Sequence, residues 1–331
     1  MTARPTSART RAAWPDIGRV ELAGLLAALA AAALVAWLSA ARPADMPVWA
    51  PWDFSWTQFL AAILGLGWYA RGVARAAPGA APNVWRQAAF VLGVGSIYAV
   101  LLTHFEYMAQ HMFFLNRLQH MVMHHVGPFL VALSWPGETL YRGMPAPLRR
   151  VFDPPALHRV MRIVQQPALA GVLFAGLICL WLVPAVHFRA MIDHRLYDVM
   201  NWSMVVDGLL FWFLVLDPRP APAARTSFAV RMIVTVAVMF PQIIAGSALT
   251  FSTRTLYSYY DLCGRLYPSL GALVDQHLGG AIVWIPSAMM SSIAFMLILN
   301  NIRLNEERTA AEEVETDDAR NVVFASRWTG R

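Results

Sequence analysis

The protein has 331 residues, of which 58% are apolar and 14% are charged, and its formal net charge is +6. A water-soluble domain of this length could not bury so much apolar surface, so the composition excludes a simple soluble domain and predicts a membrane protein. The 26 basic residues are all arginine and are scattered between apolar runs instead of forming a basic stripe, which argues against a nucleic-acid partner.

Eight apolar runs are long enough, or nearly so, to cross the ~30 Å hydrocarbon layer, which takes ~20 helical residues. In chain order they cover residues 20–41, 54–70, 87–103, 118–135, 167–186, 199–216, 232–251 and 278–300. Lipid offers the backbone no hydrogen-bond partners, so each run must be a helix. The first is longer than the apolar core of a cleaved signal peptide, which predicts an uncleaved anchor. The expected fold class is an all-α, polytopic membrane helical bundle of about eight transmembrane helices.

Arginine is distributed unevenly over the connections between these runs. Alternate connections, counted from the amino terminus, hold twenty arginines, and the other set holds six. Because basic residues are retained on the cytoplasmic side, this difference predicts that both termini are cytoplasmic. Three segments follow: a cytoplasmic amino-terminal segment (1–19), a transmembrane helical domain (20–303) and a charged, mobile cytoplasmic tail (304–331).

Histidine falls almost entirely on the opposite, outer side of this topology. Only His158 is assigned to the cytoplasm. The other eight are His104, His111, His120, His124, His125, His187, His194 and His277. Histidine tolerates interfaces, so the distribution has a purely structural interpretation. Ionisable groups at membrane depth are costly and usually serve a purpose, which favours metal capture or proton handling at the outer face.

The densest histidine stretch, residues 104–136, also contains several methionines. Thioethers prefer Cu(I), and imidazole suits either copper state. His120 and His124 are four residues apart and would share a helix face, while Met121 and His125 form a second such pair. The candidate metal ligands are His104, His111, His120, Met121, His124, His125 and His277. No carboxylate completes an HExxH pattern, so zinc hydrolysis gains no support and we expect no enzyme.

A second group of residues lies at the outer start of the last span. Asp275 would orient His277 by a hydrogen bond, with Gly279 and Gly280 admitting a neighbouring helix. Equally, Asp275 would cap a helix ahead of a small-residue packing face. Both interpretations stay open.

Asp207 lies near the middle of the sixth span and must face protein or water. Its expected partners are Asn201, Ser203 or Tyr197 on other turns of the helix. Structural polar packing is the favoured interpretation.

Two motifs carry a family resemblance, HMVMHHVGPFLVALSWP (120–136) and DQHLGGAIVWIPS (275–287). They resemble the CtaG family, the membrane assembly factors of caa-type cytochrome c oxidases, and the likeness extends over residues 52–303. The resemblance implies a seven-helix core, here with an additional amino-terminal span, in the bacterial inner membrane. It also implies help in maturing the oxidase, with oxidase subunits, membrane lipid and a periplasmic copper carrier as expected partners.

The residues at family positions are His120, Met121, His124, Asp275, Gln276, Gly279, Gly280, Trp284 and Pro286. Asn201 stands where the resemblance predicts a further histidine, and an amide oxygen suits soft copper poorly. His111 and the first span are additional. Either the chain is a divergent member, or copper ligation by the sixth span is not part of its mechanism.

The sequence therefore favours a non-enzymatic oxidase assembly factor that binds copper transiently through an outer His/Met cluster. Two alternatives stay open. A haem b redox protein would use histidines such as His120 and His277 on facing helices. A copper permease would need donors along a path, for which Met204, Asp207 and Met239 are candidates.

Overall fold

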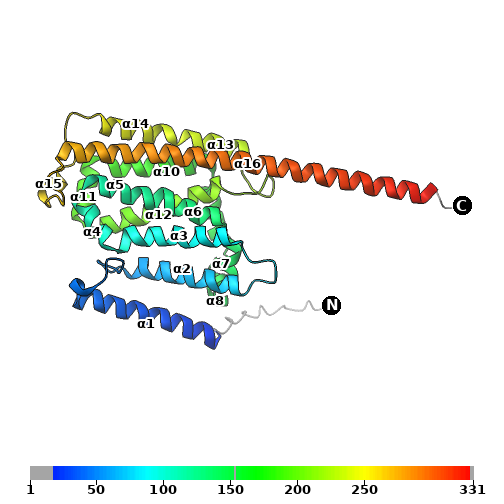
Figure 1. Cartoon of the computed structure of the whole chain (residues 1–331), viewed down its shortest axis with the longest axis horizontal. Helices are drawn as coiled ribbons and strands as arrows, with labels where there is room; N and C mark the ends of the chain where they lie inside the picture. Colours follow the sequence, from blue (N-terminus) through cyan, green and yellow to red (C-terminus); the bar gives the residue numbers. More distant parts are fainter. Residues whose placement is uncertain (1–17, 153, 329–331) are drawn as a thin grey trace, which may run out of the picture.

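The computed structural model describes residues 18–152 and 154–328, and within them the protein is helical throughout, without strands (Figure 1). The predicted all-α class is confirmed. The elements are α1 (Arg19–Ala41), η1 (Pro43–Asp45), α2 (Trp56–Ala74), α3 (Val84–Leu102), α4 (His104–His111), α5 (Phe113–Met121), η2 (Val122–Val126), α6 (Gly127–Ser134), α7 (Gly137–Gly143), α8 (Ala146–Phe152), α9 (Pro155–Val164), α10 (Pro167–Leu182), α11 (Pro184–Ile192), α12 (His194–Val215), α13 (Phe228–Ala237), α14 (Met239–Thr250), α15 (Tyr259–Leu262) and α16 (Ala272–Trp328).

The helices run side by side, so the bundle has two ends. The α15 end carries α4, α11 and α15, and the α7 end carries α7 and α8 (Figure 1). Five helices of the described chain are long and apolar enough to cross a membrane: α1, α3, α12, α13 with α14, and the apolar part of α16. A sixth is present if α9 and α10, bent by 70° at their junction, count as one. Several apolar spanning helices make this a multi-pass membrane protein.

The other predicted runs also coincide with helices, although they are shorter or more polar. The second run falls on α2 and the fifth on α10, while the fourth falls on the continuous helical stretch α5–η2–α6. That stretch begins at Phe113, five residues before the predicted start. The total of eight spans stays a prediction.

The first helix is attached loosely to the remainder. Only 6% of its apolar stretch is buried, although its mean hydropathy of 2.2 is high among the candidate spans. Glu21 accepts a hydrogen bond from Arg71 of α2 at 2.6 Å, and Ser39 donates to the carbonyl of Pro51 at 3.0 Å. An apolar helix with so little protein contact is suited to a lipid environment.

The last helix extends well beyond the bundle at the α7 end (Figure 1). The predicted tail, residues 304–331, continues α16 as far as Trp328, and its last three residues lie outside the described chain. The predicted amino-terminal segment, residues 1–19, lies outside it except for Gly18 and Arg19.

Glycines allow α3 and α12 to approach the η2–α6 segment closely. A Cβ on Gly93 of α3 would lie 2.8 Å from the carbonyl oxygen of Gly127. A Cβ on Gly208 of α12 would lie 2.4 Å from the carbonyl oxygen of His124. Both distances are shorter than side-chain carbons tolerate, so glycine is required for α3 to pack against the first turn of α6 and for α12 to pack against η2.

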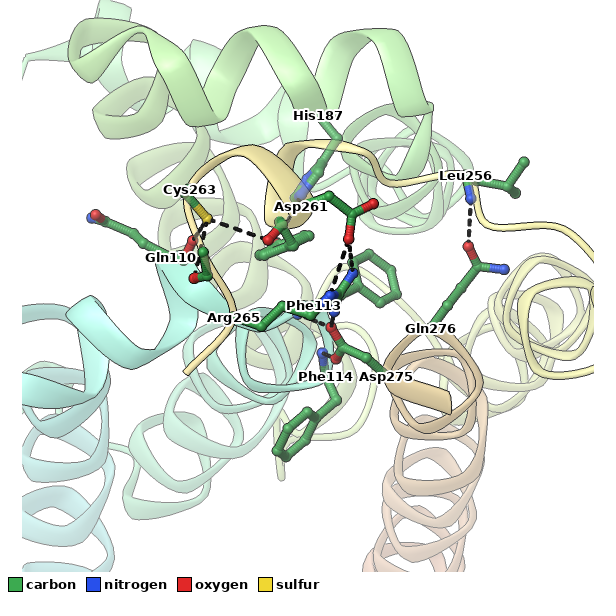
Figure 2. Close-up of polar contacts among 12 residues, drawn as sticks. Gln110, Phe113, Phe114, His187, Leu256, Asp261, Cys263, Arg265, Asp275 and Gln276 are labelled. Carbon is green, nitrogen blue, oxygen red and sulfur yellow. Dashed lines mark hydrogen bonds and ion pairs between the residues drawn. The ribbon is translucent and has the colours of Figure 1, made fainter. Parts of the chain in front are cut away.

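Asp275, in the first turn of α16, fixes the start of α5 (Figure 2). Its carboxylate accepts hydrogen bonds from the backbone N–H groups of Phe113 at 3.0 Å and Phe114 at 2.8 Å. These are donors that the first turn of a helix leaves without internal partners. Arg265 donates to the same carboxylate at 2.5 Å, and the Asp275 side chain is fully buried. Asp275 therefore caps a helix other than its own.

Gln276 provides a second connection at the same end. Its Oε1 accepts from the backbone N–H of Leu256 at 2.7 Å, as Figure 2 shows, and its Nε2 donates to the carbonyl of Arg254 at 2.9 Å. The loop between α14 and α15 is thereby held against α16. Asp275 thus positions the helix that carries the histidines, and Gln276 positions the adjacent loop.

We predict that Asp275→Ala lowers the free energy of unfolding by about 3 kcal/mol, because it leaves two N–H donors and the Arg265 guanidinium without their buried acceptor. The thermal unfolding midpoint of the purified protein in detergent measures this. Asp261→Ala is the matched control: Asp261 contacts the same arginine at 2.9 Å but is half exposed, so its loss should cost about 0.5 kcal/mol or less. Equal shifts for the two variants would contradict the capping role.

Candidate metal site in the helical bundle

The helix that carries the histidine motif is interrupted by a π-helical turn, η2. The N–H of Gly127 donates to the carbonyl of Val122, five residues earlier instead of the usual four. Such turns widen a helix locally and frequently mark functional sites. Here the wider turn brings residues five apart onto the same side, so His120 and His125 line one cavity. The α-helical spacing that pairs His120 with His124 does not describe this segment.

A chain of hydrogen bonds crosses the bundle at η2. His124 Nε2 lies 3.0 Å from Asp207 Oδ2 on α12, and its Nδ1 lies 3.3 Å from His125 Nδ1. His125 Nε2 lies 3.0 Å from Gln242 Oε1 on α14. Trp212 Nε1 donates to the backbone carbonyl of His124 at 3.2 Å, so this carbonyl of the π-helical turn has a hydrogen-bond partner on α12. Three elements are therefore tied together by one polar chain.

The partners within this chain restrict where its protons lie. Gln242 Nε2 donates to the carbonyl of Val238 at 2.9 Å, so Gln242 Oε1 accepts from His125 Nε2. A neutral His125 then accepts at Nδ1 from the Nδ1–H of His124. His124 Nε2 consequently shares one proton with the carboxyl of Asp207, and the pair has no net charge in either arrangement. A neutral pair is what a membrane interior tolerates.

Asp207 therefore has a different partner from those expected on its own helix. The acid contacts His124, whereas Ser203 donates to the carbonyl of Met200 and accepts from Trp181. Tyr197 donates to Gln119 at 3.2 Å. The expected contacts within α12 are wrong, because Asp207 contacts His124 while Ser203 and Tyr197 are engaged elsewhere, and Asn201 makes no hydrogen bond in the described chain.

A small cavity of about 20 Å³ lies beside the hydrogen-bond chain and offers soft donors. It is lined by His120, Met121, His125 and Met204, with Arg117 and Ser287 among its remaining walls. His120 is buried, and its Nε2 has no hydrogen-bond partner in the described chain. Ser287 Oγ lies 3.7 Å from the Met121 sulfur but donates its hydrogen to the carbonyl of Val283 at 2.6 Å. The volume accommodates about one water molecule or one ion.

Arg117 is a buried cation at this cavity that sequence reasoning did not identify. Its side chain is 3% exposed and forms no ion pair within the described chain. It donates to Asn116, lies 3.4 Å from His187 Nδ1 and leaves its Nε without a partner. His187 Nε2 in turn lies 3.0 Å from the Tyr260 hydroxyl. The only sequence signal was an arginine directly before an apolar run, which is normally a topology marker.

The remaining predicted ligands lie elsewhere. His277 Nε2 donates to the carbonyl of Ser252 at 2.8 Å, so Asp275 does not orient it. His111 Nδ1 lies 2.8 Å from the carbonyl of Tyr107, and the His104 ring lies 4.1 Å from the Trp52 ring. Within the described chain, no three His, Cys, Asp or Glu side chains could together hold a metal ion. The predicted ligands are thus not gathered into one site.

The supporting residues serve mainly helix packing. Gly279 faces Phe113 of α5, where a Cβ would lie 2.3 Å from the ring, and Gly280 faces the backbone of Thr250 on α14. Trp284 Nε1 donates to the Thr250 hydroxyl at 3.3 Å. Asn201 is fully buried, and neither amide atom has a hydrogen-bond partner in the described chain.

Comparison with known proteins agrees with the two sequence motifs. The family described as cytochrome c oxidase caa3 assembly factor matches residues 67–303, which is more than two thirds of the chain. Uncharacterized proteins of Mycobacterium bovis and Mycobacterium tuberculosis are each 24% identical over 264 residues, covering 76% of this chain and 39% of theirs. No solved structure matches. The chain belongs to the cytochrome c oxidase caa3 assembly factor family.

Proposed function

We propose that this protein is a non-enzymatic factor that aids maturation of a caa3-type cytochrome c oxidase by holding Cu(I) transiently in the His120–Met121 cavity. Copper is the cargo, and the oxidase catalytic subunit is its destination. Family membership supports a role in oxidase assembly. The step to copper rests on the chemistry of the cavity walls.

The observation that carries the proposal is the unpartnered, buried Nε2 of His120 beside two methionines. A buried imidazole nitrogen without a hydrogen bond is costly, and a metal ion would satisfy it. The adjacent thioethers of Met121 and Met204 are ligands that Cu(I) prefers. His125 also faces the cavity, but both its ring nitrogens are engaged with His124 and Gln242. We therefore infer that His120, Met121 and Met204 are the Cu(I) ligands.

The charge of Arg117 would favour release of the bound Cu(I). Its charge lines the cavity without a carboxylate partner in the described chain, so it repels a bound cation. Cu(I) would be held by soft ligands and weakened by this repulsion. Weak, exchangeable binding suits a carrier better than a closed tetrahedral site does.

The same proposal includes the membrane topology. Eight spans with both termini in the cytoplasm would direct the α15 end toward the periplasm, where a copper carrier could deliver the metal. The bundle would contact oxidase subunits within the bacterial inner membrane. The high apolar exposure of α1 leaves such lateral contacts available.

We predict that His120→Ala and Met121→Leu each weaken Cu(I) binding at least about tenfold, because even outer contacts of a metal ligand contribute ~10–100-fold to affinity. Titration of the purified protein against a chromophoric Cu(I) chelator measures this. His277→Ala and His158→Ala are matched histidine controls and should change the affinity less than about twofold. Equal losses in all four variants, or a wild type that binds no Cu(I), would contradict the site.

We further predict that a strain carrying His120→Ala and Met121→Leu assembles oxidase with reduced copper content. Metal analysis of the purified oxidase, normalised to its haem, measures the deficit. The strain with His277→Ala provides the control. Normal oxidase with full copper in the double variant would exclude copper delivery while leaving another assembly role intact.

Two further measurements on the same preparations separate the alternatives. A Soret band in the absorption spectrum would indicate a haem b protein. Copper uptake into sealed vesicles, lost in Asp207→Asn, would indicate a permease. We expect neither result.

A further inference from the structure

A basic cavity lies at the α7 end, remote from the histidine site. Its volume is about 440 Å³. The walls come from the end of α6, from α9, from the loop after α12 and from α13. Because these elements begin or end here, the cavity lies at the level where a bundle of spanning helices meets the lipid headgroups.

Four arginines line this cavity, together with one carboxylate, that of Asp217. Arg219 donates to Asp217 at 2.7 and 2.9 Å, which neutralises that pair. Arg162 and Arg225 form no hydrogen bond or ion pair in the described chain. The cavity therefore carries an excess of positive charge with no protein partner.

Arg231 is the buried member of this group. Its side chain is 1% exposed, and it donates to the carbonyls of Asp217, Arg219 and Thr226. Its Nε has no hydrogen-bond partner in the described chain. A buried guanidinium that is fixed by three carbonyls and still has an unused donor is suited to an anionic ligand.

The other walls are apolar and aromatic. Trp135, in a left-handed backbone conformation with φ 50°, lies beneath the Arg219 guanidinium at 5.3 Å, and Phe213 and Leu214 complete this side. An inorganic ion would gain nothing from these surfaces. A ligand with both an anionic group and hydrocarbon would use the whole cavity.

A second groove, also of about 440 Å³, adjoins the cavity through Arg162. Its apolar lining consists of Ile163 and Leu169, on either side of the 70° bend between α9 and α10. On α9, Arg159 and Arg162 accompany exposed Val160 and Ile163. A short helix with arginines and exposed apolar residues, bent away from a spanning helix, is typical of the membrane interface.

We propose that the basic cavity binds the phosphate group of an anionic phospholipid, with an acyl chain in the Ile163–Leu169 groove. Arg162 and Arg225 contact the phosphate, and Arg231 supplies a fixed donor behind them. The site is independent of copper binding. It would anchor the α7 end of the bundle to one leaflet.

Delipidated full-length protein in nonionic detergent provides the test, with bound lipid counted by native mass spectrometry during titration. We expect phosphatidylglycerol to bind at least about tenfold more tightly than phosphatidylcholine with the same acyl chains. The double variant Arg162→Gln/Arg225→Gln should lower phosphatidylglycerol affinity about 10- to 30-fold, since each arginine near a lipid phosphate contributes a few-fold. These arginines form no hydrogen bond or ion pair within the described chain and are exposed, so the thermal unfolding midpoint should not change.

The matched control is Arg189→Gln/Arg195→Gln, which removes the same charge from exposed arginines at the α15 end. Its affinity should stay within about twofold of wild type. An equal loss in both double variants would show that only net charge matters and would overturn the site. Competition by inorganic phosphate as effective as that by phosphatidylglycerol would show a soluble-phosphate site and overturn the lipid assignment.

Discussion

A polar side chain inside a membrane bundle is costly without a partner within the protein, and α5 with η2 places six of them in the interior. The buried polar residues of this one stretch are Asn116, Arg117, Gln119, His120, His124 and His125. Their partners come from several directions: Gln119 donates to a carbonyl of α3, His124 contacts α12, and His125 contacts α14. The neighbouring helices therefore supply hydrogen-bond partners to the buried polar side chains of this one helical stretch. Its start is in turn fixed by Asp275 of α16.

Hydropathy was sufficient to predict the helical fold, because lipid permits few alternatives for an apolar run of this length. It was less reliable at boundaries. The fourth run was predicted from residue 118, yet the helix begins at Phe113, since an acid 161 residues away along the chain caps it. Arg117 was consequently assigned to a connection, although it is buried. Local composition contains no information about a cap supplied by a distant helix.

At the candidate site, too, the sequence reveals the residue types but not their long-range contacts. The candidate residue types were evident from the sequence, because histidine at membrane depth is costly and the same segment carries methionines that could join it in binding a soft metal. The spatial grouping of these residues was not evident, because the spacing predicts it only for an uninterrupted α-helix. One extra residue in the η2 turn places His125 beside His120 and leaves His124 to Asp207. That partner lies 83 residues away, and nothing in the spacing of α12 indicates it.

The two buried networks also explain why so few of the many histidines are free to act. Both ring nitrogens of His124 and of His125 are occupied, His187 lies between Arg117 and Tyr260, and His277 is bound to a carbonyl. These bonds fix the helices around the cavity, so its walls cannot collapse onto an unpaired group. His120 is left with an unused nitrogen because its neighbours are committed elsewhere. In the proposed copper site, a rigid surround with one available imidazole beside the buried thioethers of Met121 and Met204 would take up an ion without reorganising the bundle.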